Sequence, residues 1–255
     1  MQRRDVMFRS EGGRVAAWVH PPAGGHRVPG PCVVMAHGFS LTRHDGLSPF
    51  AERLAAAGAT VVVFDHRFLG DSPGEPRQRF RRSAQLADWR SAVAFARTLP
   101  EVDPARVLLW GFSFSAGHAV ETAAADGRIA GLMLLCPFLD GIDRVRSTPI
   151  RLVAWILLRS LADMAGRHNL IAVTGPPGSR AAMTLPGEAD GFAASVPPGS
   201  PWRNEISPGL VVTIALHRPW TKAGRLAMPV WVGQGDNDVS VSASAIAKLV
   251  AGAAG

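Results

Sequence analysis

Short apolar runs rich in β-branched residues alternate along the chain with amphipathic segments, a pattern typical of a mostly parallel sheet covered by helices. Residues 6–8 and 15–19 predict an opening hairpin. Later apolar runs predict strands at 32–36, 60–64, 107–110, 132–136 and 230–232, the third of them after a turn at Asp103 and Pro104. Amphipathic segments predict helices at 47–57, 83–97 and 116–125, and a last one from about residue 243.

This alternation stops between Asp140 and Pro229. The stretch holds an apolar helix expected from about Ile150 to Met164, followed by passages rich in proline and glycine. It is too long for a connecting loop in a compact domain. We therefore expect residues 1–140 and 229–255 to form one core and residues 141–228 to form a cap or lid. The large apolar residues of this cap either form a lid over a hydrophobic site or pack the cap onto the core.

With 255 residues, 47% of them hydrophobic and 18% charged, the chain has the composition of a water-soluble globular protein. Its formal charge of +7 is carried almost wholly by arginine, since Lys222 and Lys248 are the two lysines. This bias, with no tyrosine, fits a gene of high G+C content better than a nucleic-acid groove, so no nucleic-acid partner is predicted. We expect one basic cluster to be a solvated face: Arg77, Arg79, Arg81 and Arg82.

The two cysteines, Cys32 and Cys136, each lie at one end of an apolar run, so no disulfide framework is implied. The first residues are charged and lack the apolar region of a secretory signal. The apolar segment from Ile150 to Leu158 is interrupted by Arg151 and is far short of the roughly 20 residues that a bilayer needs. We expect a cytoplasmic protein without a membrane partner, and the sequence leaves its oligomeric state open.

The sharpest chemical signal is a strand that runs into the turn Gly111-Phe112-Ser113-Phe114-Ser115 and then into a helix. A serine at the centre of such a turn is held on a tight corner, with small residues two positions before and after it to avoid collisions across the bend. The corner exposes the Ser113 hydroxyl at the carboxyl end of the sheet, where a helix N-terminus stabilises a developing oxyanion. The alternative interpretation is a capped helix without chemistry.

A second signal lies upstream, where the strand at 32–36 ends in His37, Gly38 and Phe39. In a fold with a serine corner, the backbone N–H just past such a strand supplies the other half of an oxyanion hole. We expect Phe39 to be that donor. Without the serine corner, the same residues would be a satisfied histidine beside a turn.

Other cofactor-dependent chemistries lack their motifs in this chain. A P-loop needs Gly-Lys-Ser/Thr, but neither lysine follows a glycine. A dinucleotide site needs Gly-x-Gly-x-x-Gly after an early strand, whereas Gly233-Gln234-Gly235 follows the last one. There is no His-Glu-x-x-His motif, and the cysteines are far apart. We therefore expect no metal and no other cofactor.

The segment Asp65-His66-Arg67-Phe68-Leu69-Gly70-Asp71-Ser72-Pro73-Gly74 resembles the Asp-x-Arg-Gly-x-Gly-x-Ser-x-Gly loop of the α/β-hydrolase superfamily, with Phe68 where glycine is usual. The motifs occur in the order of bacterial α/β hydrolases related to dienelactone hydrolases, acyl esterases and S15-type peptidases. The resemblance covers about residues 1–141 and 229–250. It implies an α/β-hydrolase fold, with helices on both faces of a mostly parallel twisted sheet and a helical cap insertion.

The resemblance also implies hydrolysis of a carboxylic ester or a related acyl bond through an acyl-serine intermediate. Residue by residue, it makes Ser113 the nucleophile and directs the N–H groups of Phe39 and Phe114 at the oxyanion. The implied partner is a small-molecule acyl or ester substrate. Esterases, thioesterases, carbon–carbon hydrolases and peptidases share this scaffold, so the substrate stays open.

The resemblance places the acid after the last strand, where a Gly-x-x-Asp turn counted from Gly235 selects Asp238. A carboxylate there fixes the tautomer of the imidazole that acts as base. Asp236 fits a turn that closes a strand. Asp140, after the preceding strand, is a reserve candidate for the acid.

The histidine of the triad is missing from its expected place. Chain order in this fold is Ser, then Asp, then His, and no histidine follows Asp238 before Gly255. We interpret the chain as C-terminally truncated and expect it to be inactive or weak, because a serine hydroxyl without a base is a weak nucleophile. His217 in the expected cap stays a candidate base, whereas three histidines are expected in loops: His20, His26 and His44. The alternative function is a non-catalytic α/β-hydrolase-fold protein that binds a ligand or partner.

Overall fold

The computed structural model describes residues 3–24 and 29–253 of the chain. The predicted hairpin consists of β1 (Arg4–Ser10) and β2 (Gly13–His20), which pair antiparallel. β2 also pairs antiparallel with β4 (Thr60–Phe64) and so joins the hairpin to the main sheet. His20, expected in a loop, is the last residue of β2, and His26 lies outside the described residues.

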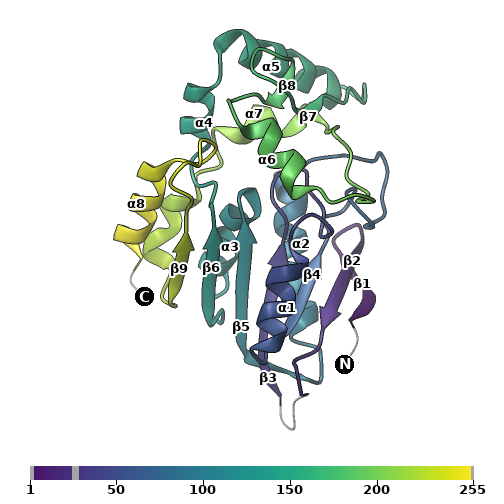
Figure 1. Cartoon of the computed structure of the whole chain (residues 1–255), viewed down its shortest axis with the longest axis vertical. Coiled ribbons are helices and arrows are strands. Elements are labelled where there is room, and N and C mark those ends of the chain that lie inside the picture. The colour runs from purple at the N-terminus through teal and green to yellow at the C-terminus, as the bar shows by residue number, and fades with distance from the viewer. Residues whose placement is uncertain (1–2, 25–28, 254–255) are drawn as a thin grey trace.

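The sheet has seven strands in the order β1-β2-β4-β3-β5-β6-β9 (Figure 1). Its parallel part contains β4 together with β3 (Gly30–Ala36), β5 (Val102–Phe112), β6 (Gly131–Leu135) and β9 (Val230–Gly233). Every residue of β4 is buried, as expected for an apolar run covered on both faces. Ala36 pairs with both Phe64 and Gly111, so the carboxyl ends of the central strands meet at one edge of the sheet.

Helices cover both faces of this sheet, as the alternation predicts. Three helices contribute to one core, in which Trp89 and Leu249 are buried: α2 (Arg82–Ala96), α3 (Phe114–Ala125) and α8 (Ala243–Gly252). α1 (Ser48–Ala56) covers the opposite face, where Ala51 joins a second core. Neighbouring residues of β5 point into different cores, since Leu109 belongs to the first and Trp110 to the second.

β5 begins earlier than the sequence predicts. Its pairing with β3 jumps from Val102 opposite Gly30 to Val107 opposite Cys32, so the expected turn is a bulge within the strand. The Asp103 carboxylate accepts a hydrogen bond from the Ala105 amide at 2.9 Å and closes this local turn. Strand pairing then resumes beyond it.

Between β6 and β9 the chain forms short elements: α4 (Gly141–Ser147), α5 (Ile150–Met164), β7 (Ala172–Thr174), β8 (Ala181–Met183), α6 (Glu188–Ser195), η1 (Pro208–Leu210), α7 (Val211–Ile214) and η2 (Pro219–Arg225). α5, α6, α7 and the β7–β8 pair lie beyond the carboxyl ends of the central strands (Figure 1). Ile156 and Ile206 belong to a third core there, together with Phe114 of α3. η2 instead packs beside α3 and α8, and its Ala223 joins the first core. Within the described residues, no helix has the length and apolarity that crossing a membrane requires.

Candidate active site

Ser113 occupies the turn between β5 and α3, where the motif places it. Its backbone has φ 53° and ψ −114°, a conformation of the kind that costs a non-glycine residue about 1–3 kcal/mol. Hydrogen bonds hold both sides of the turn: the Ser113 amide donates to the Leu135 carbonyl at 2.9 Å, and the Phe138 amide donates to the Ser113 carbonyl at 3.0 Å. The end of β6 and the segment after it therefore hold this backbone conformation in place.

The residues that flank the turn are small for a steric reason. A Cβ atom on Gly111 would lie 2.5 Å from Cα of Ala116 and 2.7 Å from the carbonyl oxygen of Ser115, both backbone atoms. Ser115 stands where Gly-x-Ser-x-Gly motifs have their second glycine. Its buried hydroxyl lies 3.2 Å from Nε2 of His66, so the extra polar atom has a partner.

Two unpaired amides belong to the segments that meet at Ser113. A Cβ atom on Gly38 would lie 3.2 Å from Cβ of Ser113, so the loop after β3 runs directly against the turn. Among the described residues, neither the Phe39 amide nor the Phe114 amide has a hydrogen-bond acceptor. Unpaired N–H groups beside a serine hydroxyl are what an oxyanion hole requires.

Asp238 follows β9 and lines the same cavity as Ser113, a space of about 290 Å³. Its Oδ1 accepts a hydrogen bond from the Ser240 amide at 2.8 Å. Cys136, at the end of β6, lines this cavity too, and burial together with the nearby Asp238 carboxylate raises the pKa of its thiol. Asp236 is not part of the cavity wall. The structure thus brings Ser113 and Asp238 to one cavity.

Ser113 also lines a second cavity, of about 90 Å³, whose walls are mostly apolar. Phe39, Met183 and Ser240 border both cavities, so Ser113 stands where the two meet. Two separate spaces therefore adjoin the Ser113 turn, one small and mostly apolar and the other larger.

His217, the candidate base, packs behind the turn instead of facing the Ser113 hydroxyl. Its buried Nδ1 lies 3.1 Å from Oε1 of Glu121 and accepts a hydrogen bond from Nε of Arg82 at 3.0 Å. Its ring stacks on Phe114, with 4.6 Å between the centroids. Burial lowers the pKa of His217 more than Glu121 raises it. Among the described residues, no side chain forms a hydrogen bond with the Ser113 hydroxyl.

Three more buried histidines continue this row behind the turn. The ring centroids of His37 and His66 lie 5.1 Å apart, those of His66 and His118 6.0 Å, and those of His118 and His217 5.3 Å. Burial lowers the pKa of each of the three, to about 3 for His37. At neutral pH the row is therefore uncharged.

Asp140, the reserve candidate for the acid, has structural partners. Its Oδ1 accepts the Ile142 amide at 2.9 Å and caps α4, while its Oδ2 accepts Nε1 of Trp220 at 2.7 Å and two nitrogens of Arg218 at 3.2 Å. Burial alone would raise the pKa of Asp140, but these donors outweigh it and hold the pKa below its ordinary value. Asp140 lines neither cavity beside Ser113.

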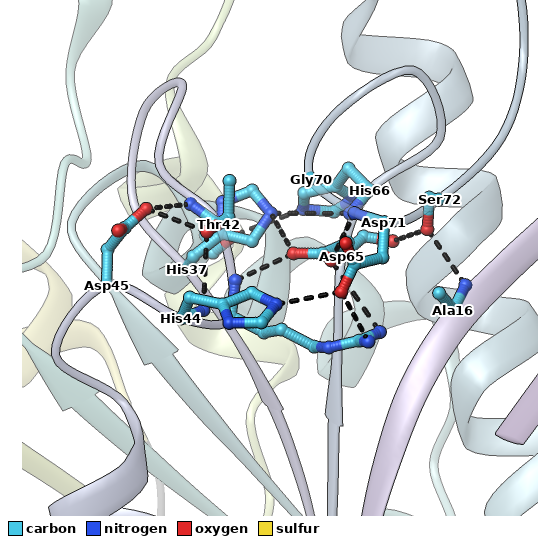
Figure 2. A network of polar contacts seen from close by, with 12 residues as sticks. Ala16, His37, Thr42, His44, Asp45, Asp65, His66, Gly70, Asp71 and Ser72 are labelled. Atoms are coloured by element: carbon cyan, nitrogen blue, oxygen red, sulfur yellow. Dashed lines mark hydrogen bonds and ion pairs between the residues drawn. The ribbon is translucent and has the colours of Figure 1, made fainter. Parts of the chain in front are cut away.

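A polar network braces the loop that carries Phe39 (Figure 2). The fully buried carboxylate of Asp65, just after β4, accepts the amides of Arg43 at 2.7 Å and Asp71 at 3.0 Å. Burial raises the pKa of Asp65 to about 6. The Asp65 carbonyl accepts the Ser72 hydroxyl at 2.7 Å, and that hydroxyl accepts the Ala16 amide at 2.8 Å. The network thus ties the loops after β3 and β4 to β2.

The position of Phe68 in the Asp65–Gly74 loop requires a left-handed backbone conformation. Phe68 stands where the resembling motif has glycine, and it adopts the left-handed φ of 73° that glycine favours. Its ring lies against Gly74, where a Cβ atom would come within 2.7 Å of the ring. Gly70, between Phe68 and Gly74 in the same loop, packs on Asp65, and a Cβ atom on Gly70 would collide with the Asp65 carboxylate.

His44, Asp65 and Asp71 also place potential metal-ligand atoms within 4.8 Å of one another. The guanidinium of Arg43 lies 2.8 Å from Oδ2 of Asp71 and 3.6 Å from Oδ2 of Asp65. Its charge already pairs with both carboxylates and would repel a metal cation. We therefore interpret this group as part of the structural network.

The expectation of a single solvated face for the four neighbouring arginines is wrong. Arg77 donates to the carbonyls of Gly70 and Ser72, and Arg82 donates to the carboxylate of Glu121. Arg81 is exposed. The loop folds back on its surroundings, where two backbone carbonyls pair with Arg77 and the partly buried Glu121 carboxylate pairs with Arg82.

Sequence reasoning missed a connection that reaches both cavities. Arg144 of α4 donates to Oε1 of Glu188 at 2.6 Å and to Oε2 at 3.2 Å. The Ser240 hydroxyl donates to the same carboxylate at 2.9 Å. No local pattern marks these residues, because Glu188 lies 44 positions after Arg144 and 52 before Ser240.

A mostly parallel sheet with a strained serine turn at the end of its central strand, and unpaired amides beside it, defines an α/β hydrolase. The chain belongs to the serine aminopeptidase S33 family, which matches residues 28–255. Solved structures that share the fold include the following two. The α/β hydrolase GrgF from Penicillium sp. sh18 has a TM-score of 0.84 at 23% identity, over 99% of this chain and 86% of that one. DcsB in complex with its substrate analogue has a TM-score of 0.81 at 22% identity, over 99% and 87%.

Relatives with closer sequences carry several different activities in their names. The quorum-quenching protein AidA of Acinetobacter baumannii is 37% identical over 231 residues, which cover 89% of this chain and 75% of AidA. A thiohydrolase of Eupenicillium brefeldianum is 35% identical over 136 residues, 53% of this chain and 43% of the thiohydrolase. A polyketide transferase of Stachybotrys chlorohalonatus is 32% identical over 193 residues, 74% of this chain and 62% of the transferase. The chain thus spans less than half of that thiohydrolase and less than two thirds of that transferase.

Proposed function

We propose that this α/β hydrolase cleaves a carboxylic ester, or a related acyl bond, through an acyl-serine intermediate. The observation that carries the proposal is the Ser113 turn, which presents a hydroxyl at the junction of two cavities beside the unpaired amides of Phe39 and Phe114. The thiohydrolase relative supports a hydrolytic reaction, and the polyketide transferase relative supports transfer of a polyketide group as a related chemistry of the same core.

In the proposed reaction, Oγ of Ser113 attacks the substrate carbonyl carbon, and the carbonyl electron pair moves onto the oxygen. The amides of Phe39 and Phe114 stabilise this oxyanion. Collapse of the intermediate leaves the acyl group on Ser113 and expels the alcohol, thiol or amine, which takes up the proton that the Ser113 hydroxyl has given to the base. Water then attacks the acyl carbon, and collapse of the second tetrahedral intermediate releases the acid and restores the Ser113 hydroxyl.

The proton of the Ser113 hydroxyl needs an acceptor, and the described residues place no imidazole beside it. We therefore propose that these 255 residues, taken alone, turn over activated esters slowly. The cavity of about 290 Å³ that holds both Ser113 and Asp238 has room for an added imidazole molecule. Asp238 would orient that imidazole by accepting its second N–H, which is the role of a triad acid.

We also propose that the elements between residues 141 and 228 act as a cap. Residues of α4, α5 and β8 supply much of the wall of the apolar cavity, among them Val145, Val153 and Ala182. η2 packs on the core, so the cap as a mobile or exchangeable unit would end before Pro219. This division explains how relatives with one core can differ in substrate.

Two measurements test the proposal on the chain as it stands. With added imidazole, a fluorophosphonate probe is expected to label the unsubstituted protein and not Ser113→Ala, and without imidazole the labelling is expected to be much slower. Hydrolysis of p-nitrophenyl acetate is expected to rise with added imidazole in a saturable way, beyond the parallel rise in Ser113→Ala, and Asp238→Asn is expected to lose most of that increment. Absence of both labelling and rescue would support the alternative, a non-catalytic ligand-binding protein, which the unpartnered Ser113 hydroxyl favours.

A further inference from the structure

Among the described residues that line the apolar cavity beside Ser113, Arg144 alone is charged. Most of the other lining residues are aromatic or aliphatic, for example Phe138, Val153 and Ile156. An arginine in the wall of a substrate cavity ordinarily selects an anion, because its planar guanidinium pairs with a carboxylate or phosphate. What this cavity accepts therefore depends on how the charge of Arg144 is paired.

Glu188 already takes up that charge. Its side chain is fully buried, that of Arg144 is 14% exposed, and two guanidinium nitrogens reach the two carboxylate oxygens at 2.6 and 3.2 Å. The rest of the carboxylate is satisfied by the Leu185 amide at 2.8 Å and the Ser240 hydroxyl at 2.9 Å. Arg144 also donates to the Ala182 carbonyl at 3.3 Å. A second carboxylate brought by a ligand would thus lose its hydration and meet a neutral ion pair.

We propose that Glu188 determines the specificity of this cavity: by neutralising Arg144, it makes the cavity accept an uncharged acyl chain and exclude one that ends in a carboxylate. The proposal rests on the proposed function for the assignment of the bound group as the acyl part of the substrate. The larger cavity, with Asn237 and Asp238 in its wall, is then left for the alcohol, thiol or amine part.

Removing the charge of Glu188 while keeping its shape is expected to weaken or abolish this selection. In Glu188→Gln, the amide oxygen still accepts a hydrogen bond, but the positive charge of Arg144 has no counter-charge. A carboxylate at the far end of an acyl chain can supply it, and a charge-assisted hydrogen bond of this kind corresponds to about tenfold or more in affinity.

The experiment measures binding without reaction, in the Ser113→Ala background, by ligand-observed NMR titration. The probes are hexanamide and adipamate, which have the same chain length but differ in a terminal carboxylate. Hexanamide is expected to bind at least about tenfold more tightly than adipamate, and each methylene removed from the amide to cost about fourfold. In Glu188→Gln, the ratio of the two affinities is expected to shift toward adipamate by about tenfold or more.

Matched variants locate the effect. Glu205→Gln makes the same change at the exposed Arg203–Glu205 pair and is expected to leave both affinities unchanged. Val153→Trp is expected to abolish hexanamide binding, whereas Leu158→Trp, at a 68% exposed position of the same helix, is expected to preserve it. The double variant Arg144→Met with Glu188→Gln removes both charges without leaving one unpaired, and it is expected to keep the preference for hexanamide even if Glu188→Gln alone does not fold.

The proposal is overturned if adipamate binds the Ser113→Ala chain as tightly as hexanamide, if Glu188→Gln folds and leaves the ratio unchanged, or if the double variant prefers adipamate. Because binding is measured without a nucleophile, these outcomes are independent of fluorophosphonate labelling. Labelling of Ser113 together with any of these three results would sustain the proposed hydrolase and refute the role of Glu188. The expected binding results without labelling of Ser113 would support the role of Glu188 in ligand selection and refute the proposed hydrolase.

Discussion

Replacing Gly111 by alanine tests the geometry on which the candidate site depends. The added Cβ would lie 2.5 Å from Cα of Ala116 and 2.7 Å from its amide nitrogen, whereas non-bonded carbon atoms prefer about 3.5–4.0 Å. These neighbours are backbone atoms of α3, so no side chain can rotate away. Strand β5 or helix α3 must shift by about 1 Å. Overpacking of this kind costs about 1–3 kcal/mol, and we expect a value near the upper end.

For a chain of this length, about 3 kcal/mol corresponds to a fall in Tm of about 6–12 °C. The same shift moves the Ser113 hydroxyl relative to the Phe39 amide, and a displacement of about 1 Å can slow a reaction about a hundredfold. Gly111→Ala is therefore expected to lower the urea midpoint and to slow fluorophosphonate labelling together.

Gly127→Ala is the matched control, because a Cβ atom there would have no neighbour within 4 Å. It is expected to change the unfolding free energy by less than about 0.5 kcal/mol. The reasoning fails if Gly111→Ala unfolds within that same margin of the parent and is labelled at the parental rate.

Three further predictions concern the polar groups around the site. Asp65→Asn is expected to lower the unfolding free energy by about 1–3 kcal/mol and to slow labelling, because an amide oxygen cannot replace the carboxylate that accepts two backbone amides; an unchanged urea midpoint would contradict this. Asp140→Asn is expected to lower stability with little effect on imidazole rescue, whereas Asp238→Asn is expected to do the reverse, and a loss of rescue in Asp140→Asn alone would make Asp140 the acid. Stability is also expected to fall as the pH drops below about 6.5, because the unfolded chain protonates histidines that burial keeps neutral in the folded protein, at up to about 1.4 kcal/mol per pH unit for each. The groups concerned are His37, His66, His118 and His217. The raised pKa of Asp65 has the opposite effect, because it increases the folding stability as the pH falls from about 6 to 4. This is one group against four histidines, so the net stability is still expected to fall. Urea unfolding curves that coincide at pH 7 and 5 would refute the argument.

The elements that the sequence predicts well are those with a strong local signal. β4 matches its predicted bounds because a run of four buried apolar residues after Thr60 fits a central strand of a parallel sheet that is covered on both faces. α5 also matches its predicted bounds, from Ile150 to Met164. The serine turn was predictable for a similar reason, since Gly111 and Ser113 mark a local conformation that few sequences permit.

The elements that the sequence does not reveal depend on distant partners. β7 and β8 have three residues each, too few for a period-two pattern. Pro104 suggests the end of an element, yet β5 continues past it, because pairing with β3 resumes at Val107. Glu188 at the start of a helix suggests a solvated side chain, but its partner Arg144 buries it completely. The position of His217, away from the Ser113 hydroxyl, likewise depends on its contacts with Arg82 and Glu121, which no local sequence pattern predicts.

The tether of the segment after β9 has a consequence for protein engineering. Ser240, two residues beyond Asp238, is bonded to Glu188 of α6, and Ser242 donates to Asp143 of α4 at 2.6 Å. Asp238 is therefore aligned by helices that lie outside the sheet. A chimera that grafts these helices from a relative, without also transplanting residues 238–242, would inherit a new substrate pocket and a misaligned carboxylate. Exchange of these helices in this protein would thus require moving both segments as one block.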